Sequence, residues 1–376
     1  MTERLLLKEE ARSLCPDCCR EIPARTFAES NGVFMEKKCP EHGCVRAMVE
    51  RDAMAYRMLM NASPTPRPPD TLVIPVTHRC NLHCTMCFLP DDGVPDPPPA
   101  AIQKLIDEFG GAIVFSGGEP TVRRDLPELI AYAAKRGRNT CIATNGLLFE
   151  NSDYVTSLAD AGLGACLFSF NSLSDRAYEQ IEGQPLLDRK RKALENVLAS
   201  PILPRFSSTL VAGCNENEVP ELKRFFLSRG IAAPTWRIRT HAALGRHHDT
   251  PNLWMSDLLQ RVCDAWSVDR EELLLALGAG IDYHGTSHAY FTVPFREEAT
   301  HTTNTETPTD PLHKPIADRR LRACGLRVFA WPDITNVDLD ETAQTGIWHV
   351  GPGGEPMPFI EAVIRNLYAP DWNWPS

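Results

Sequence analysis

The sequence of 376 residues has no run of about 18 consecutive apolar residues, so it predicts no membrane-spanning helix. It also has no excess of positive charge, because 49 acidic residues outnumber 39 Lys and Arg to give a formal net charge of −10. A nucleic-acid partner normally requires a basic surface, and this balance argues against one. The N-terminus lacks the long apolar core and cleavage site of a signal peptide, so we expect a cytoplasmic protein.

Cysteine, in contrast, is frequent, and eight of the 13 cysteines fall into two clusters. One cluster lies between residues 15 and 44 and the other occupies residues 80–87. In a cytoplasmic chain such clusters indicate metal ligands rather than disulfides. The segment 61–70 between them holds four prolines, which predicts a stiff linker. It separates a small N-terminal module, residues 1–60, from the rest of the chain.

Strand and helix patterns alternate from residue 71 to residue 250. Alternation of this kind predicts βαβ units and a parallel sheet, and repeated right-handed crossovers curl such a sheet into a full or partial barrel. We therefore expect an α/β protein with a partial (β/α)6 barrel related to the TIM barrel, followed by a C-terminal extension over 251–376 that carries substrate choice or a cap. The six predicted strands are 71–77, 112–116, 139–144, 165–170, 206–212 and 235–240.

The second cysteine cluster, Cys80, Cys84 and Cys87, directly follows the first of these strands. A loop at this position lies at the C-terminal rim of a parallel barrel, where catalytic groups gather. Three thiolates can bind three irons of a [4Fe–4S] cluster and leave the fourth iron open for a small molecule. A closed zinc site would need a fourth ligand. His83 could serve as one, although its neighbours leave it little freedom to turn.

The spacing Cys80-x3-Cys84-x2-Cys87, with Phe88 next to the last cysteine, resembles that of the radical S-adenosylmethionine (SAM) superfamily. The resemblance implies that SAM binds the open iron through its amino and carboxylate groups. It further implies that an electron donor such as flavodoxin or ferredoxin drives cleavage of SAM to a 5′-deoxyadenosyl radical, which abstracts hydrogen from the substrate.

Polar residues at the ends of the next three strands support this resemblance. "SGGEP" after the second strand looks like the GGE motif that binds the SAM ammonium group, although it also fits a plain strand-to-helix turn. The third strand ends in "TNG" and the fourth in "SFN". The resemblance implies a SAM site formed at this rim by Gly117, Gly118, Glu119, Thr144, Asn145, Ser169 and Asn171.

Four basic residues have two interpretations each. Lys190 and Arg191 lie beside the apolar stripe of a predicted helix, 186–199. Either one of them reaches the SAM carboxylate, or they belong to a solvated basic face. Arg237 and Arg239 alternate on the sixth strand and share one face of it. If that face is the barrel interior, an arginine there suits an anionic ligand group.

The N-terminal module contains a C-x2-C pair, Cys15 and Cys18, and a C-x2-H pair, Cys39 and His42. This spacing is typical of a zinc ribbon or a rubredoxin-like site. A histidine ligand favours zinc over iron, and a module this small needs a metal to fold. Cys19 and Cys44 are alternative ligands.

The N-terminal pairs and several later blocks resemble one radical SAM branch over about residues 14–250, the branch of archaeal pterin methyltransferases and tetraether lipid synthases. Asn171 stands where an acidic residue is usual, and no cysteine cluster follows the barrel as in the lipid synthases. We expect an enzyme that forms a carbon–carbon bond, methylation-like or by radical coupling, on a small biosynthetic intermediate. A peptide-modifying maturase and a non-catalytic metal-binding scaffold are the alternatives.

Two features of the last third have open interpretations. Asp333, Asp338 and Asp340 form either a solvated acidic turn or part of a lid whose acids meet a polar or cationic substrate. His284 and His288 are four residues apart and would share a face if helical, which would allow a second metal site. Gly285 weakens that helix.

Overall fold

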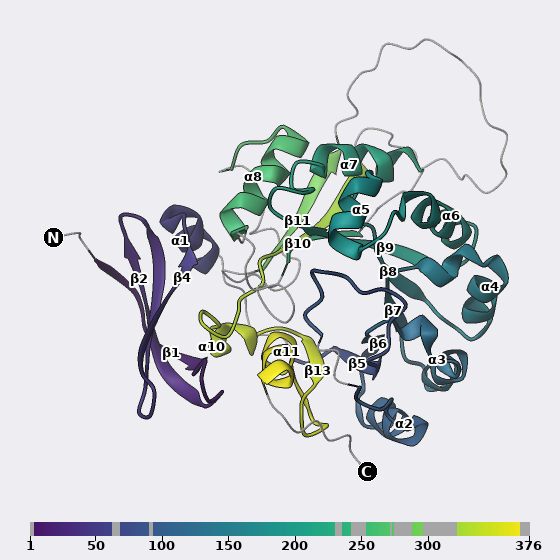
Figure 1. The fold of residues 1–376 in the computed structure, drawn as a ribbon, viewed down its shortest axis with the longest axis horizontal. Coiled ribbons are helices and arrows are strands. Elements are labelled where there is room, and N and C mark those ends of the chain that lie inside the picture. The colour runs from purple at the N-terminus through teal and green to yellow at the C-terminus, as the bar shows by residue number, and fades with distance from the viewer. Residues whose placement is uncertain are drawn as a thin grey trace, which may run out of the picture.

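The computed structural model describes residues 4–61, 68–89, 93–229, 235–241, 253–270, 273, 288–295 and 322–368. A small N-terminal sheet stands beside a larger body in which helices surround a curved sheet (Figure 1). No helix in the described ranges is long and apolar enough to cross a membrane. His284 lies outside the described residues, so the histidine pair of the sequence analysis has no structural account.

The N-terminal module is a four-stranded antiparallel sheet in the order β1-β2-β3-β4. Alternate residues of β2, among them Ile22 and Ala24, are buried on one face while their neighbours are exposed, as a half-buried sheet requires. A helix, α1 (Ala53–Asn61), follows the sheet. The four strands are β1 (Leu5–Leu14), β2 (Glu21–Glu29), β3 (Gly32–Cys39) and β4 (Gly43–Glu50).

The larger sheet has ten strands in the order β11-β12-β10-β9-β8-β7-β6-β5-β13-β14. Its centre is formed by the six predicted strands, which run parallel in chain order and confirm the expected barrel topology. Their apolar runs are short and locally bounded, so the sequence located them within a few residues. They are β5 (Thr71–Thr77), β6 (Ala112–Gly117), β7 (Thr140–Thr144), β8 (Ala165–Ser169), β9 (Leu203–Leu210) and β10 (Thr235–Thr240).

Amphipathic helices connect these strands and lie on the outer side of the curved sheet (Figure 1). Helix α3 illustrates the pattern: Leu126, Leu129, Ile130 and Ala133 recur at helical spacing and are all buried in the main core. The connecting helices are α2 (Pro99–Glu108), α3 (Leu126–Lys135), α4 (Ser152–Asp160), α5 (Asp175–Glu182), α6 (Leu187–Leu198) and α7 (Val219–Ser228).

The C-terminal region extends the sheet at both edges. Strand β12 (Arg322–Phe329) pairs in parallel with β10, and β13 (Ile347–Val350) pairs in parallel with β5. The sheet therefore has eight successive parallel strands, two more than the sequence predicted. Antiparallel strands β11 (His288–Phe295) and β14 (Pro356–Pro358) extend the edges. The other helices within the described residues are α8 (Met255–Trp266), α10 (Leu339–Thr342) and α11 (Phe359–Tyr368).

The N-terminal module is bound to this C-terminal extension. Asp338 accepts from the Lys8 ammonium group at 2.5 Å, and Asp340 pairs with Arg12 at 2.6 Å. Lys37, which is 3 % exposed, donates to the Ile334 carbonyl oxygen at 2.6 Å. The lid hypothesis is therefore wrong for Asp338 and Asp340, because their carboxylates bind cations of the module rather than a substrate.

Candidate functional site

The cysteine loop begins where β5 ends and lies against the first turn after β6. The Gly118 amide donates to the Thr77 carbonyl oxygen at 2.8 Å, and the Glu119 amide donates to the Arg79 carbonyl oxygen at 2.9 Å. Gly117 has φ of +126°, and a Cβ placed on Gly118 would lie 2.4 Å from the Arg79 oxygen. Both glycines of "SGGEP" are thus required by close contact with the loop that carries the cysteines.

The far side of the loop packs on the helices that follow β8. The Thr85 amide donates to the Ile181 carbonyl oxygen at 3.0 Å, and Leu82 and Cys84 share a small apolar cluster with Tyr178. Desolvation raises the pKa of the Cys84 thiol far above its usual value, and the nearby Glu182 carboxylate raises it further. A cation at this thiolate would remove that cost, as the irons of a cluster do.

The distances between ligand atoms indicate which thiols could bind a single metal ion. A zinc ion with Zn–S bonds of about 2.3 Å holds its sulfur ligands about 3.8 Å apart. Among the described residues, one group alone brings three or more ligand atoms within 4.8 Å of one another, and it lies in the N-terminal module. Cys80, Cys84 and Cys87 do not form such a compact group. The assignment of a multi-iron cluster to this loop, rather than a single zinc ion, stays a prediction.

Glu119 connects the ends of two strands from a buried position, with 1 % of its surface exposed. Its carboxylate accepts from the Thr144 hydroxyl at 2.7 Å, the Asn145 amide at 2.6 Å and the Thr121 hydroxyl at 2.6 Å. Burial raises the pKa of the Glu119 carboxyl, while these hydrogen bonds act to lower it. Asn145 in turn donates through its side chain to Asn81 of the cysteine loop at 2.8 Å. Direct contact of Glu119 with SAM stays a prediction.

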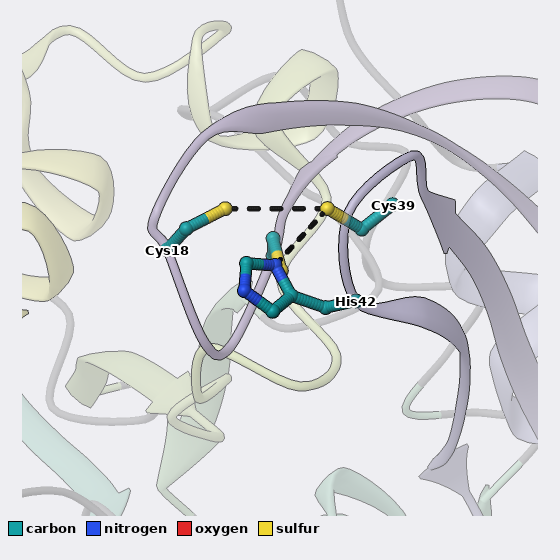
Figure 2. A group of neighbouring side chains, drawn as sticks. Cys18, Cys39 and His42 are labelled. Atoms are coloured by element: carbon teal, nitrogen blue, oxygen red, sulfur yellow. Dashed lines mark hydrogen bonds between the residues drawn. The ribbon is translucent and has the colours of Figure 1, made fainter.

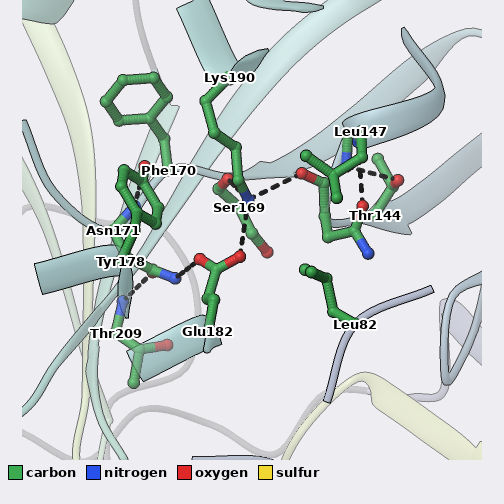
Figure 3. A network of polar contacts seen from close by, with 12 residues as sticks. Leu82, Thr144, Leu147, Ser169, Phe170, Asn171, Tyr178, Glu182, Lys190 and Thr209 are labelled. Carbon is green, nitrogen blue, oxygen red and sulfur yellow. Dashed lines mark hydrogen bonds and ion pairs between the residues drawn. The ribbon is translucent and has the colours of Figure 1, made fainter. Parts of the chain in front are cut away.

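Lys190 projects inward from α6 to the same strand ends (Figure 3). Its ammonium group donates to the carbonyl oxygens of Asn145 at 2.8 Å and Ser169 at 3.1 Å, and pairs with Glu182 at 3.2 Å. The side chain is fully buried, so the solvated alternative is wrong for Lys190. The buried Nε atom of Arg191 has no hydrogen-bond partner among the described residues, and contact of Arg191 with SAM stays a prediction.

Asn171 occupies the position where the related branch usually has an acid. Its side-chain amide donates to Glu182 at 2.8 Å, and its oxygen accepts from the Thr209 amide at 2.8 Å (Figure 3). A carboxylate here would face the Glu182 carboxylate without a proton to share, so the amide is the compatible choice. The sequence analysis missed Glu182. The available signal was its place on the buried stripe of α5, one and four residues after Ile181 and Tyr178.

Arg237 and Arg239 lie on the inner face of the sheet. Their Nε atoms donate to the hydroxyls of Ser207 at 3.1 Å and Thr209 at 2.9 Å on the neighbouring strand. The alternate residue Trp236 packs in the outer core beneath the helices, which places the arginines inside the barrel. Burial lowers the pKa of Arg239 to about 10, against the opposing effect of Cys87.

A second group of ligands lies in the N-terminal module. Cys15, Cys18, Cys39 and His42 place one ligand atom each within 4.8 Å of all the others. The sulfur atoms of Cys18 and Cys39 are 4.0 Å apart, and the Cys39 sulfur lies 3.4 Å from His42 Nδ1 (Figure 2). Burial raises the pKa of the Cys39 thiol, but hydrogen bonds from the Glu41 and His42 amides and the His42 ring outweigh it and bring the pKa to about 6. These distances suit one tetrahedral metal ion.

The two alternative ligands do not belong to this group. Cys44 is exposed and lies outside the set of converging atoms. Cys19 adopts φ of +55° and packs instead on an apolar cluster with Phe88 of the cysteine loop. The Phe88 ring lies 5.3 Å from that of Trp331 in this cluster. The loops of both candidate metal sites therefore rest on one shared apolar cluster.

Comparison with known proteins supports both regions. Residues 74–226 match the model of the radical SAM superfamily, and residues 7–51 match the HMPTM N-terminal zinc ribbon domain. The chain is 33% identical over 257 residues to a 7,8-dihydro-6-hydroxymethylpterin dimethyltransferase of Methanocaldococcus jannaschii, covering 58% of this chain and 50% of the relative. It is 32% identical over 160 residues to a GTP 3′,8-cyclase of Chlorobaculum tepidum, covering 40% and 48%.

The chain spans about half the length of these two relatives. Among solved structures, Streptococcus suis SuiB bound to S-adenosylmethionine aligns with a TM-score of 0.46 at 20% identity, over 52% of this chain and 46% of that one. The family matches cover the ribbon, the cysteine loop and the strand ends described above. Residues 74–226 therefore carry a radical SAM domain, and residues 7–51 in front of it carry a zinc ribbon.

Proposed function

We propose that this protein is a radical SAM enzyme that binds a [4Fe–4S] cluster through Cys80, Cys84 and Cys87 and modifies a small molecule. The cluster and SAM together supply one-electron cleavage of SAM to a 5′-deoxyadenosyl radical. The protein supplies the three thiolates, the polar strand ends that position SAM, and a buried barrel that excludes water from the radical. Reduction requires an external donor of the flavodoxin or ferredoxin kind.

The observation that carries the proposal is the attachment of the cysteine loop to the ends of two neighbouring strands and to a helix at once. The loop bonds to the turn after β6 through Glu119, to the end of β7 through Asn145, and to α5 through Thr85. A metal-binding scaffold without catalysis would need the thiols but not this assembly of polar groups around them. Within it, Lys190 holds the carbonyl ends of β7 and β8 in place, and Glu119 holds the amide of Asn145.

We assign the modification to carbon–carbon bond formation, with a methylation-like transfer favoured. The support is the relative from Methanocaldococcus jannaschii, which is named as a pterin dimethyltransferase, together with a ribbon of the HMPTM type. The ribbon is proposed to hold zinc through Cys15, Cys18, Cys39 and His42, where it stabilises the module.

The test is anaerobic incubation of the iron-reconstituted protein with SAM and dithionite. We expect 5′-deoxyadenosine and methionine as products, measured by liquid chromatography and mass spectrometry. Cys84→Ala should abolish both, whereas Cys166→Ala, which alters a buried thiol on the outer side of β8, should leave them unchanged. Iron-loaded protein that never cleaves SAM under reduction would instead support the scaffold alternative.

A further inference from the structure

A partly open cavity of about 530 Å³ lies against the inner face of the parallel sheet. Thr71, Ala112 and Thr235, the first residues of β5, β6 and β10, line it, so it lies toward the strand ends opposite the cysteine loop. Small-molecule sites typically have volumes of about 300–1,000 Å³. The cavity is thus large enough for a ligand, and it opens at the end of the barrel where these strands begin.

Three arginines from three adjacent strands line this cavity: Arg205 on β9, Arg237 on β10 and Arg327 on β12. Arg237 is directly opposite Arg327 in the strand register, and Arg205 is opposite Thr235, two residues before Arg237. Neighbouring strands are about 4.8 Å apart, so the three guanidinium groups originate from one small area of the wall.

The side of the cavity that carries the three arginines is rich in positive charge, whereas the whole chain has a formal net charge of −10. Among the described residues that line the cavity, Asp70 is the one carboxylate. Asp70 accepts a hydrogen bond from the Thr71 hydroxyl at 2.8 Å. Thr71 begins β5, which is separated from the arginine-bearing strand β9 by β6, β7 and β8. Three arginines on one side of a cavity supply several N–H donors of the kind that bind phosphate and carboxylate groups.

The cationic wall continues toward the cysteine loop. Arg239 follows Arg237 on the same face of β10, about 6.7 Å further along the strand. It therefore lies nearer the C-terminal end of β10, at the edge of the parallel sheet where the cysteine loop follows β5. Hydroxyls of Ser207 and Thr209 hold both guanidinium groups at Nε. A ligand seated on Arg237 and Arg327 would therefore extend from the cavity toward the site of SAM.

We propose that this cavity binds the anionic group of a small molecule, a phosphate or a carboxylate, on Arg237 and Arg327 with Arg205 beside them. Arginine matches both groups through paired N–H donors, which an ammonium group does not. The identification of that molecule as the substrate rests on the proposed function, whereas the anion site itself does not. The substrate class is accordingly an acid or a phosphorylated compound.

The test is direct binding to the full-length, iron-reconstituted protein without SAM, by anaerobic calorimetry at low ionic strength. Inorganic pyrophosphate and succinate are the two probes, and the one that binds more tightly identifies a phosphate or a carboxylate site. We expect Arg237→Ala and Arg327→Ala each to weaken binding about ten- to a hundredfold, since each removes charge-assisted hydrogen bonds. Arg237→Lys should recover part of the loss, because it keeps the charge but not the paired donors.

Arg224→Ala is the matched control, since Arg224 is exposed on α7 and pairs with Glu221. It should bind the probes as the wild type does, and circular dichroism should show all variants folded. Wild-type protein that binds neither probe at millimolar concentration would overturn the proposal, as would unchanged binding in Arg237→Ala and Arg327→Ala. Failure of SAM cleavage with intact probe binding would instead refute the proposed function and leave the anion site standing.

Discussion

The two cysteine regions of this protein differ in whether their residues form a complete set of ligands for one metal ion. In the ribbon, Cys15, Cys18, Cys39 and His42 converge to within 4.8 Å, which is a full tetrahedral set for one ion. In the barrel loop, Cys80, Cys84 and Cys87 do not form such a compact group, and no fourth ligand joins them among the residues that the structure describes. That loop is instead surrounded by hydrogen-bonding groups from the turn after β6, the end of β7 and helix α5.

A metal site that the protein fills completely requires different surroundings from a site that leaves one position for a small molecule. The ribbon ligands satisfy one ion and hold a small sheet together, which suits a structural metal. An open cluster must keep a position for a ligand, so its surroundings carry the binding groups. Both loops rest on the cluster that contains Phe88, Cys19 and Trp331, so the closed site also supports the open one.

The largest expected effect separates the two sites. Replacement of Cys80, Cys84 and Cys87 by Ala should abolish the iron–sulfur cluster and all SAM cleavage, because no ligand to its irons remains. The ribbon should keep about one metal per chain, since structural zinc binds zinc-finger peptides with apparent free energies of about 10–16 kcal/mol. Metal analysis with electron paramagnetic resonance checks both results. Loss of zinc together with iron would show that the two sites are one folding unit.

The second prediction concerns the buried ion pair behind the loop. Lys190→Met should destabilise the protein by about 3–5 kcal/mol, because it leaves the Glu182 carboxylate buried without its cation. Lys190→Met combined with Glu182→Gln should cost less, since no buried charge is then unpaired. Denaturant unfolding measures both. Equal stability of Lys190→Met and wild type would mean that solvent reaches this pair.

The outcome for Lys190 shows where sequence reasoning succeeds and where it ends. The six central strands were predicted because each is a short apolar run with turn residues nearby. The parallel pairing of β12 with β10 was not, because the partner strands are about 80 residues apart and no local pattern encodes their register. Lys190 lies at the edge of its helix stripe, where a small rotation decides between solvent and core. Its burial depends on Glu182, which comes from another helix.

The third prediction tests the contact between "SGGEP" and the loop. Gly118→Ala should cost about 1–3 kcal/mol and lower the iron content, because its Cβ would lie 2.4 Å from the Arg79 carbonyl oxygen. Gly110→Ala is the control, since a Cβ there meets nothing within 4 Å. Iron per chain and unfolding free energy are the measurements. Normal cluster content in Gly118→Ala would show that the loop tolerates displacement.

The smallest expected effect is that of Glu119→Gln, which keeps the shape of the side chain and removes its charge. The Glu119 carboxylate accepts hydrogen bonds from Thr144, Thr121 and Asn145. A Gln side chain has one acceptor oxygen and loses some of these bonds, so the substitution should lower the free energy of unfolding by about 1–3 kcal/mol. If Glu119 also contacts the SAM ammonium group, SAM affinity should fall about ten- to a hundredfold with normal cluster content. Calorimetry with SAM and denaturant unfolding on the same samples separate the two roles. Reduced stability with wild-type SAM affinity would assign Glu119 to the strand ends alone and leave the binding of SAM to the open cluster and its other neighbours.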